Sequence, residues 1–219
     1  PIMAGSDRFR IVVTGRSAHG GRPWQGVDPI VTASQIVLGL QTIVARQTDI
    51  TRAPVVVSVG SIRGGVRSNI IPDTVELVGT VRTFDPEMRR ETLERIELIA
   101  TQIAAAAGAT ATVEPDDEPN KPVVNDPALT ARMLPTLIRA APADGLVVPP
   151  FSTVAEDFSF YSDEVPTLYV FVGSTAADRD AATAPSNHSP MFQIDEKSLD
   201  IGLRTMLGLA LDYLQGSGG

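Results

Sequence analysis

The sequence predicts an α/β protein: a ferredoxin-like β-α-β-β-α-β domain over residues 8–117, followed by an incomplete α/β segment over residues 118–215. Three observations predict this class. Strand-like and helix-like segments alternate in the order of the split β-α-β unit. Both helices of that unit begin at an Asp-Pro pair. The second half holds only one strand-like run among helices and loops, and a single strand needs further sheet beside it.

The first strand and the first helix follow from residue types. Residues 8–16 (RFRIVVTGR) are rich in β-branched residues and bounded by polar residues and glycine, which predicts a strand. Asp28 is a good N-cap and Pro29 a good first helical residue, so a helix is expected from here to about Gln47. Its apolar residues recur at helical spacing: Ile30, Ala33, Ile36, Val37, Leu40, Ile43 and Val44.

Two further strands are expected to pair. Residues 55–62 (VVVSVGSI) and residues 74–84 (TVELVGTVRTF) are joined by a loop that contains Arg67-Ser68-Asn69, which suggests an antiparallel pair. The second run alternates. One side of this strand is expected to carry Val75, Leu77, Gly79 and Val81.

The second helix repeats the Asp-Pro start at Asp85 and Pro86, and Gly108 is a natural stop for it. Residues 109–114 complete the unit as its fourth strand, and residues 115–122 (PDDEPNKP) are expected to form a linker or a domain boundary. The apolar stripe of this helix comprises Leu93, Ile96, Ile99, Ala100, Ile103 and Ala107.

The remaining elements do not form a complete core. A helix is expected over residues 126–140, capped by Asn125 or Asp126, and a buried-type strand over residues 166–173 (PTLYVFVG). A short helical piece near residues 156–161 and a last helix over residues 196–214, capped by Asp195, are also expected. The apolar face of the last helix would carry Leu199, Leu203, Met206, Leu207, Ala210 and Leu214.

The loop over residues 174–192 is long for a compact domain unless it lines a functional site. We therefore expect residues 1–7 and 118–215 to belong to a larger domain whose other part is missing.

Charge and composition argue against several classes of partner and of metal site. The 219 residues carry a formal net charge of −8 and the pI is about 4.7, which argues against nucleic acid and against an anionic membrane as partner. No apolar run approaches the roughly 18–20 residues of a membrane span, and we expect no signal peptide. The absence of cysteine excludes disulfides and thiolate metal sites and is compatible with the cytoplasmic location that we expect.

The chain has two histidines, His19 in GRSAHGGRPWQGVDPI and His188 in APSNHSPMFQIDE. A loop histidine is by default a surface residue. The alternative is a metal ligand, because imidazole is a common ligand of zinc. The spacing between the two follows no local zinc-finger pattern.

Two polar residues of the first domain can bind an anion. Asn69, in VRSNIIPD, would by default be a turn residue, and Arg82, in GTVRTFD, a solvated strand charge. Together they can hold a carboxylate, since arginine offers a planar fork of donors. Glu156 and Asp157, in AEDFSFY, are either a helix N-terminal pair or polar support for a site.

Four of these stretches resemble, in order and spacing, the aminoacylase, hippurate hydrolase and carboxypeptidase-G group of two-metal amidohydrolases: GRSAHGGRPWQGVDPI, NIIPDTVELVGTVRTFDPEMR, AEDFSFY and APSNHSPMFQIDE. The resemblance covers nearly the whole chain. It implies a catalytic α/β domain interrupted by a ferredoxin-like lid that also dimerises. This chain resembles the lid plus the C-terminal part of the catalytic domain. The family's N-terminal part, with an H-x-D or C-x-H motif, further ligands and a glutamate general base, has no match here.

The resemblance also implies roles for single residues. His188 corresponds to the family's last metal ligand. His19 corresponds to the lid histidine that stabilises the oxyanion of the tetrahedral intermediate in the neighbouring subunit's active site. Asn69 and Arg82 correspond to lid residues that hold the substrate's carboxylate, and Gly173 lines the pocket. Glu156 and Asp157 also match a family motif, and for them we expect structural support.

The implied activity is metal-assisted hydrolysis of the amide bond of N-acyl amino acids or similar small amide or peptide substrates, by a homodimer. Two divalent ions activate a bridging water; zinc is the first expectation, with manganese, cobalt and nickel as alternatives. Because His188 is the one ligand that matches, the isolated chain is expected to be inactive. The alternative from another class is a non-catalytic dimerisation or binding module derived from the lid.

Overall fold

The computed structural model describes residues 1–115, 117–143 and 145–216. The chain divides into two compact units. Unit 1 comprises Pro1–Val123 and Phe151–Asp163, and unit 2 comprises Val124–Pro150 together with the residues from Glu164 onward. Asp116, in the predicted linker, and the last three residues of the tail lie outside the described residues.

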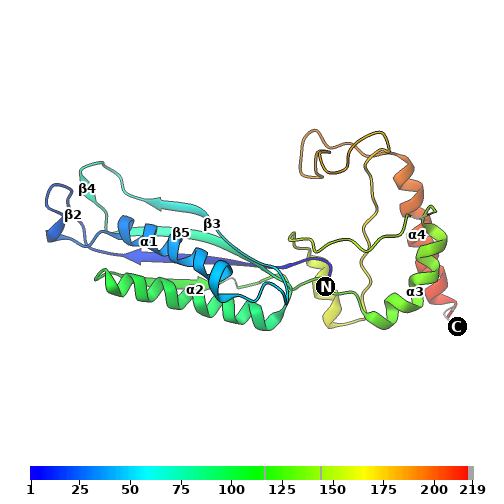
Figure 1. Cartoon of the computed structure of the whole chain (residues 1–219), viewed down its shortest axis with the longest axis horizontal. Coiled ribbons are helices and arrows are strands. Elements are labelled where there is room, and N and C mark those ends of the chain that lie inside the picture. The colour runs from blue at the N-terminus through cyan, green and yellow to red at the C-terminus, as the bar shows by residue number, and fades with distance from the viewer. Residues whose placement is uncertain (116, 144, 217–219) are drawn as a thin grey trace. The chain divides into compact units, whose positions relative to one another are not determined.

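Unit 1 is a two-layer sandwich in which two helices cover one face of a four-stranded sheet (Figure 1). The strands lie in the order β3-β5-β1-β6, and each pairs antiparallel with its neighbour. This arrangement confirms the ferredoxin-like β-α-β-β-α-β class that the sequence predicts. Its elements are β1 (Gly5–Thr14), α1 (Pro29–Thr42), β3 (Val55–Gly64), β5 (Thr74–Thr83), α2 (Pro86–Ala106) and β6 (Thr110–Pro115).

Alternation along the strands builds the core of unit 1. Every second residue of β5 is buried, as predicted, and β1 likewise buries Phe9 and Ile11. Gly79 is needed where β5 passes over Phe9, because a Cβ there would lie 2.1 Å from the Cζ atom of that ring. The helices close the core with Ile36 of α1 and Ile96 of α2, both fully buried.

The helix ends follow the predicted caps. The Asp28 carboxylate accepts from the Ile30 N–H at 2.8 Å, and the Asp85 carboxylate accepts from the Met88 N–H at 2.9 Å. Gly108 has a φ of +73°, the left-handed conformation expected of a residue that stops a helix. After α1 the chain continues as a π-helical turn, η2 (Ile43–Gln47), so the helix ends where the sequence predicts.

The helical stretch Pro29–Gln47 is the one candidate membrane span among the described residues, by length and composition, with a mean hydropathy of 1.2. Polar residues interrupt this stretch, so it does not form the continuous apolar run that a membrane span was expected to need. In the structure it lies against the sheet and fully buries Ile36, Leu40 and Ile43, as a core helix does.

Unit 1 extends beyond the predicted boundaries. β1 begins at Gly5 rather than at residue 8. Within the predicted linker or domain boundary, Asn120 exchanges backbone hydrogen bonds of 2.8 and 3.0 Å with Ser6, which tie this residue to β1. Two short strands also escaped prediction: β2 (Ala18–His19) pairs with β4 (Ile70–Ile71) at one end of the sheet (Figure 1). A short 3₁₀ helix, η1 (Pro23–Gln25), follows β2.

Residues 151–163, which the sequence assigned to the second domain, also belong to unit 1. They end in a 3₁₀ helix, η3 (Asp157–Asp163), where a short helical piece is expected. The ring of Phe151 packs against that of Phe84, with centroids 4.8 Å apart.

In unit 2, α3 (Pro127–Ala140) and α4 (Lys197–Leu214) lie side by side (Figure 1). Asp126 caps α3 through the Leu129 N–H at 2.7 Å. The strand predicted over residues 166–173 is wrong, since no strand forms there among the described residues. Instead the side chain of Asn125 bonds both the N–H and the carbonyl of Tyr169, so this extended segment is held on one edge by a side chain and has no ladder of neighbouring strands.

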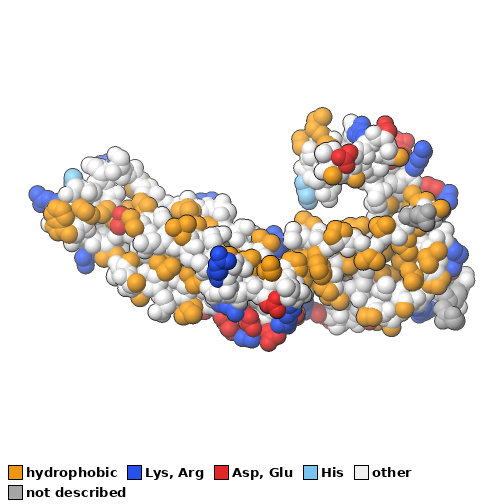
Figure 2. Space-filling model, in the orientation of Figure 1, with side chains coloured by type: hydrophobic (Ala, Val, Ile, Leu, Met, Phe, Trp, Pro, Cys, Tyr) orange, Lys and Arg blue, Asp and Glu red, His pale blue; other side chains and the backbone are white. Residues whose placement is uncertain are grey.

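The apolar face of α4 is exposed. Its predicted apolar residues pack against no core among the described residues of unit 2, and Figure 2 shows apolar side chains gathered on the surface of this unit. An apolar surface of this kind is typical of an interaction site. The exposed members of this face are Leu199, Leu203, Met206, Leu207 and Leu214.

Candidate functional site

The stretch that carries His19 is a closed loop anchored to the sheet. Arg16 and Val27 exchange two backbone hydrogen bonds of 2.9 Å, which join the ends of the loop. The N–H of Ser17 donates to the Asp73 carboxylate at 2.9 Å, and its hydroxyl donates to the Ile71 carbonyl at 2.8 Å. Gly15 allows this closure, because a Cβ there would lie 2.2 Å from the Val27 carbonyl oxygen.

The loop brings His19 and Asn69 together. His19 lies opposite Ile70 in the β2–β4 ladder, and the N–H of Gly20 donates to the Asn69 carbonyl at 2.8 Å. Both side chains are exposed at this end of the sheet. The His19 ring accepts a hydrogen bond at Nδ1 from the Gly21 N–H, 3.0 Å away. An imidazole that accepts at Nδ1 can donate from Nε2.

Arg82 lies far from this pair within one chain. β5 begins at Thr74, just after β4, and reaches Arg82 eight residues later, a separation of about 26 Å at the usual rise of a strand. The expectation that Asn69 and Arg82 bind one carboxylate together is therefore not met inside a single subunit. The extended conformation of β5 is the reason, since it carries Arg82 to the end of the sheet away from Asn69.

The positive charge of Arg82 is not neutralised by a carboxylate among the described residues. Its Nη1 donates to the hydroxyls of Ser6 and Thr80 and, at 3.2 Å, to the Val81 carbonyl. All three acceptors are neutral, and no carboxylate pairs with Arg82 among the described residues. A half-buried guanidinium held by neutral acceptors, with Nε and Nη2 left over, is suited to binding a carboxylate.

Sequence reasoning missed the residues that hold Arg82. Thr80 precedes it by two positions and so lies on the same face of β5, a signal that alternation could have given. Ser6 lies directly opposite Arg82 in the β1–β5 register, and its role emerges only from that pairing. The Thr80 hydroxyl also donates to the Asp7 carbonyl at 3.0 Å, which ties this group to β1.

A buried ion pair supports the same corner of unit 1. The Asp7 side chain is 1% exposed and receives hydrogen bonds of 2.9 Å from Nε and 2.5 Å from Nη2 of Arg89, on α2. The pair joins the helix layer to the beginning of β1. A carboxylate buried this deeply needs such a partner, because an uncompensated buried charge is costly.

His188 lies in unit 2, on the exposed turn of residues 186–192. The turn is closed by the Ser189 N–H, which donates to the Ser186 carbonyl at 2.9 Å, and by the Phe192 N–H, which donates to the Ser189 carbonyl at 3.0 Å. Over the described part of the chain, no group of three or more histidine or carboxylate side chains is placed to hold a metal ion. The described residues alone therefore do not form a two-metal centre.

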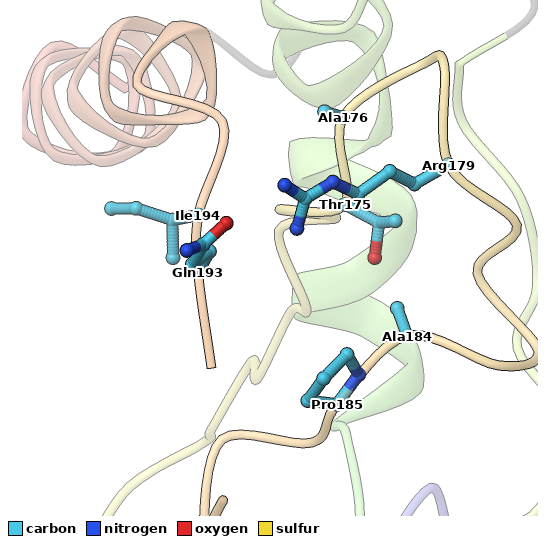
Figure 3. A pocket seen from close by; sticks show the side chains of 7 residues that line it. All are labelled: Thr175, Ala176, Arg179, Ala184, Pro185, Gln193 and Ile194. Carbon is cyan, nitrogen blue, oxygen red and sulfur yellow. The ribbon is translucent and has the colours of Figure 1, made fainter. Parts of the chain in front are cut away.

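The loop around His188 borders a small open pocket (Figure 3). The guanidinium of Arg179 extends across it toward Gln193 and Ile194, with Thr175 beside it. Pro185 and Ala184 form an apolar wall. Arg179 has no ion-pair partner among the residues that the structure describes, so the pocket offers a cation and an amide beside apolar surface.

Gly173 lines a second open groove of unit 2, between α3, α4 and the extended segment before it. A Cβ at Gly173 would meet no atom within 4 Å. Glu156 and Asp157 lie at the start of η3 in unit 1, where the Glu156 carboxylate is 3.5 Å from the Phe158 N–H. This contact is a local one, at the beginning of a short helix.

Comparison with known proteins shows which proteins this chain is similar to. Residues 3–108 match a family model described as the peptidase dimerisation domain. The chain is 39% identical to N-acetyl-L-cysteine deacetylase of Bacillus subtilis, with 91% of this chain and 45% of that protein covered. It is 33% identical to thermostable carboxypeptidase 2 of Saccharolobus solfataricus, with 97% and 53% covered.

A solved structure is also similar. It is a dinuclear metal-binding peptidase of the M20 family from Bacillus subtilis, with a TM-score of 0.73, 32% identity, and coverage of 98% of this chain and 51% of that one. The chain thus spans about half the length of the curated relatives that it matches.

Proposed function

Because the chain carries the dimerisation domain of the M20 peptidase family and matches its enzymes beyond that domain, we propose that it forms the lid and C-terminal part of a metal-dependent amidohydrolase. Its substrates are N-acyl amino acids or similar small amides and peptides. The observation that carries this proposal is the placement of His19 beside Asn69 on an exposed loop, with the uncompensated charge of Arg82 at the other end of the sheet.

In the proposed reaction, His19 donates a hydrogen bond to the oxygen of the attacked amide carbonyl as negative charge develops there. Such a donor stabilises the tetrahedral intermediate. The exposed loop leaves the imidazole free to meet a substrate bound by another subunit. Arg82 holds the substrate's carboxylate. Since His19 lies on β2, near the beginning of β5, and Arg82 lies near the end of β5, one active site would take them from two different subunits.

His188 supplies one imidazole to a two-metal centre, and the other ligands and the general base come from a segment outside this chain. This assignment rests on the resemblance of its motif and on the dinuclear centre named for the similar structure. The exposed apolar face of α4 is the surface that the missing segment would cover. Zinc is our first expectation for the two metals.

The dimer forms, in this proposal, along the free edge of β3. The sheet has two edges, β3 and β6. The β3 edge is apolar, since Val56 and Ile62 are exposed on the strand and Val31 and Leu38 on the neighbouring α1. The β6 edge exposes polar residues instead, namely Thr110, Thr112 and Glu114. A second copy pairing with β3 about a twofold axis would satisfy its backbone and cover the apolar side chains.

Mixed dimers test the reaction and the assembly together. In the full-length protein, His19→Ala and His188→Ala should each abolish hydrolysis of N-acyl amino acids. When both variants are expressed together, the hybrid dimer keeps one site with both native histidines, and random pairing should restore about a quarter of the wild-type rate. No restoration would contradict a His19 that acts in the neighbouring subunit.

The competing proposal is a lid-derived dimerisation or binding module without catalysis. Retention of His19, Asn69, Arg82 and His188 in one chain favours the hydrolase. The two are distinguished by the mass of the native protein: a species that contains only 23.2 kDa chains would favour the module. An additional catalytic segment on each chain would favour the hydrolase.

A further inference from the structure

The hydrogen bond from Gly21 to His19 fixes which ring nitrogen carries the proton. The Gly21 N–H donates to Nδ1 over 3.0 Å, and an N–H can donate only to an unprotonated nitrogen. A neutral imidazole held this way carries its proton on Nε2. A tight turn sets the geometry, since the Arg22 N–H donates to the His19 carbonyl at 2.7 Å.

The close approach also explains why this position is a glycine. A Cβ on residue 21 would lie 3.2 Å from Nδ1 and 3.3 Å from Cε1 of His19. Those distances are shorter than the 3.5–4.0 Å or so at which non-bonded carbon atoms pack best, so the ring would have to move. The backbone of Gly21 is outside the left-handed region, so it is the position of the ring, and not backbone strain, that disfavours a side chain.

We propose that Gly21 is a positioning residue that holds His19 as an Nε2–H donor. The inference rests on the proposed function, in which that proton meets the developing oxyanion. With the other tautomer, an Nδ1–H would face the Gly21 N–H, and Nε2 would have a lone pair where a donor is required. Gly21 therefore selects the tautomer that the reaction needs, before substrate binds.

Nuclear magnetic resonance of the ¹⁵N-labelled chain tests the hydrogen bond without any assay of activity. The chain has two histidines, so His19→Ala assigns the ring signals. We expect a scalar coupling across the hydrogen bond between the Gly21 nitrogen and Nδ1, a pyridine-like Nδ1 and a pyrrole-like Nε2. Gly21→Ala should lose the coupling. Absence of the coupling in the wild-type chain, or a proton on Nδ1, would overturn the inference.

Gly202→Ala is the matched control. It is the same substitution in α4, where a Cβ meets no atom within 4 Å, and it should leave the His19 signals unchanged. In the full-length protein, Gly21→Ala should lower kcat about tenfold to a hundredfold, as displaced catalytic groups do, with KM close to that of the wild type. Equal kcat for Gly21→Ala and the wild type would refute the positioning role. Full activity of His19→Ala would instead refute the proposed oxyanion role, whatever the coupling shows.

Discussion

At the scale of single residues, Arg82 shows how neutral partners preserve a charge for a ligand. Ser6 and Thr80 orient its Nη1 and add no negative charge. We predict that the double variant Ser6→Ala, Thr80→Val raises KM about tenfold, because each lost hydrogen bond is worth about 1 kcal/mol and part of that orients the guanidinium. The measurement is steady-state hydrolysis of an N-acyl amino acid by the full-length protein.

The control for this prediction is a substrate whose carboxylate is replaced by a carboxamide. Its KM should not respond to the double variant, because it presents no negative charge to Arg82. Thr110→Val, on exposed β6, serves as the control for the substitution itself. An equal rise of KM for both substrates would show that Ser6 and Thr80 support the fold and have no part in recognising the carboxylate.

A second prediction concerns the ion pair between Asp7 and Arg89. Because Asp7 is 1% exposed, Asp7→Ala should lower the free energy of unfolding of unit 1 by about 3 kcal/mol, the lower end of the range for a broken buried pair, since Arg89 is partly exposed. Urea denaturation followed by circular dichroism measures it. Glu94→Ala, which breaks the exposed Arg90–Glu94 pair, should cost no more than about 0.5 kcal/mol. Similar losses for the two variants would contradict the structural role of Asp7.

The candidate site could be predicted only in part from the sequence. His19, Asn69 and Arg82 lie in continuous motifs, and a resemblance that depends on motifs finds them. The strand predicted over residues 74–84 already separates Asn69 from Arg82 along one chain, so the shared carboxylate site stays a prediction. Ser6, which faces Arg82 across the sheet, was not foreseen, because no motif contains the strand register.

At the scale of elements, α2 shows what a cap contributes. The Asp85 carboxylate accepts from the N–H groups of Glu87 and Met88 and also pairs with Arg52. Asp85→Ala should lower the free energy of unfolding by about 1 kcal/mol, the usual cost of a lost N-cap. Asp85→Asn should lose less, because asparagine also caps helices well. Thermal unfolding of the two variants side by side measures the difference. The interpretation as a cap would be wrong if alanine proved as stable as asparagine.

The same cap predicts a pH dependence. The hydrogen bond from the Met88 N–H, with help from Arg52, holds the pKa of Asp85 below its usual range. A pKa that is lower in the folded state gives stability that is present above the unfolded pKa and is lost as the pH falls through the folded one. The advantage of the wild type over Asp85→Asn should therefore shrink below about pH 4. Unfolding curves from pH 7 to pH 2 measure this, and an advantage that grows on acidification would contradict it.

The elements that could be predicted are those whose signals are local. Asp28, Asp85 and Asp126 cap their helices as expected, because a cap depends on residues two or three positions away. β2 and β4 were missed, because two-residue strands have no periodicity and pair across about fifty positions of sequence. Residues 166–173 were predicted as a strand on composition alone, and composition cannot supply the neighbouring strand that a ladder requires.

At the scale of the whole molecule, the two edges of the sheet differ in polarity. β3 and α1 leave an apolar edge in water, while β6 ends the sheet with threonines and a glutamate. Ile62 on β3 is 59% exposed. An exposed apolar side chain on a free edge strand is unfavourable in a monomer, because such an edge tends to pair with another chain. The proposed dimer removes this exposure and gives the His19 loop a neighbouring subunit to reach.

We therefore predict that Ile62→Lys converts the dimer to a monomer, because a charge on the paired edge would be buried without a partner. Sedimentation of the chain should change from twice 23.2 kDa to 23.2 kDa, while Thr112→Lys on the β6 edge should leave the dimer intact.

Trp24, the one tryptophan, is 75% exposed in the His19 loop, so its fluorescence reports on the contacts of that loop. In the full-length protein, where the loop can enter the partner's active site, the emission of Trp24 should move to longer wavelength in Ile62→Lys, because the tryptophan would then be exposed to water. Hydrolysis should fall with it, although Ile62 touches no substrate, because a monomer cannot place His19 in a second active site. A dimer that survives Ile62→Lys and dissociates in Thr112→Lys would mean that the sheets join along β6 instead.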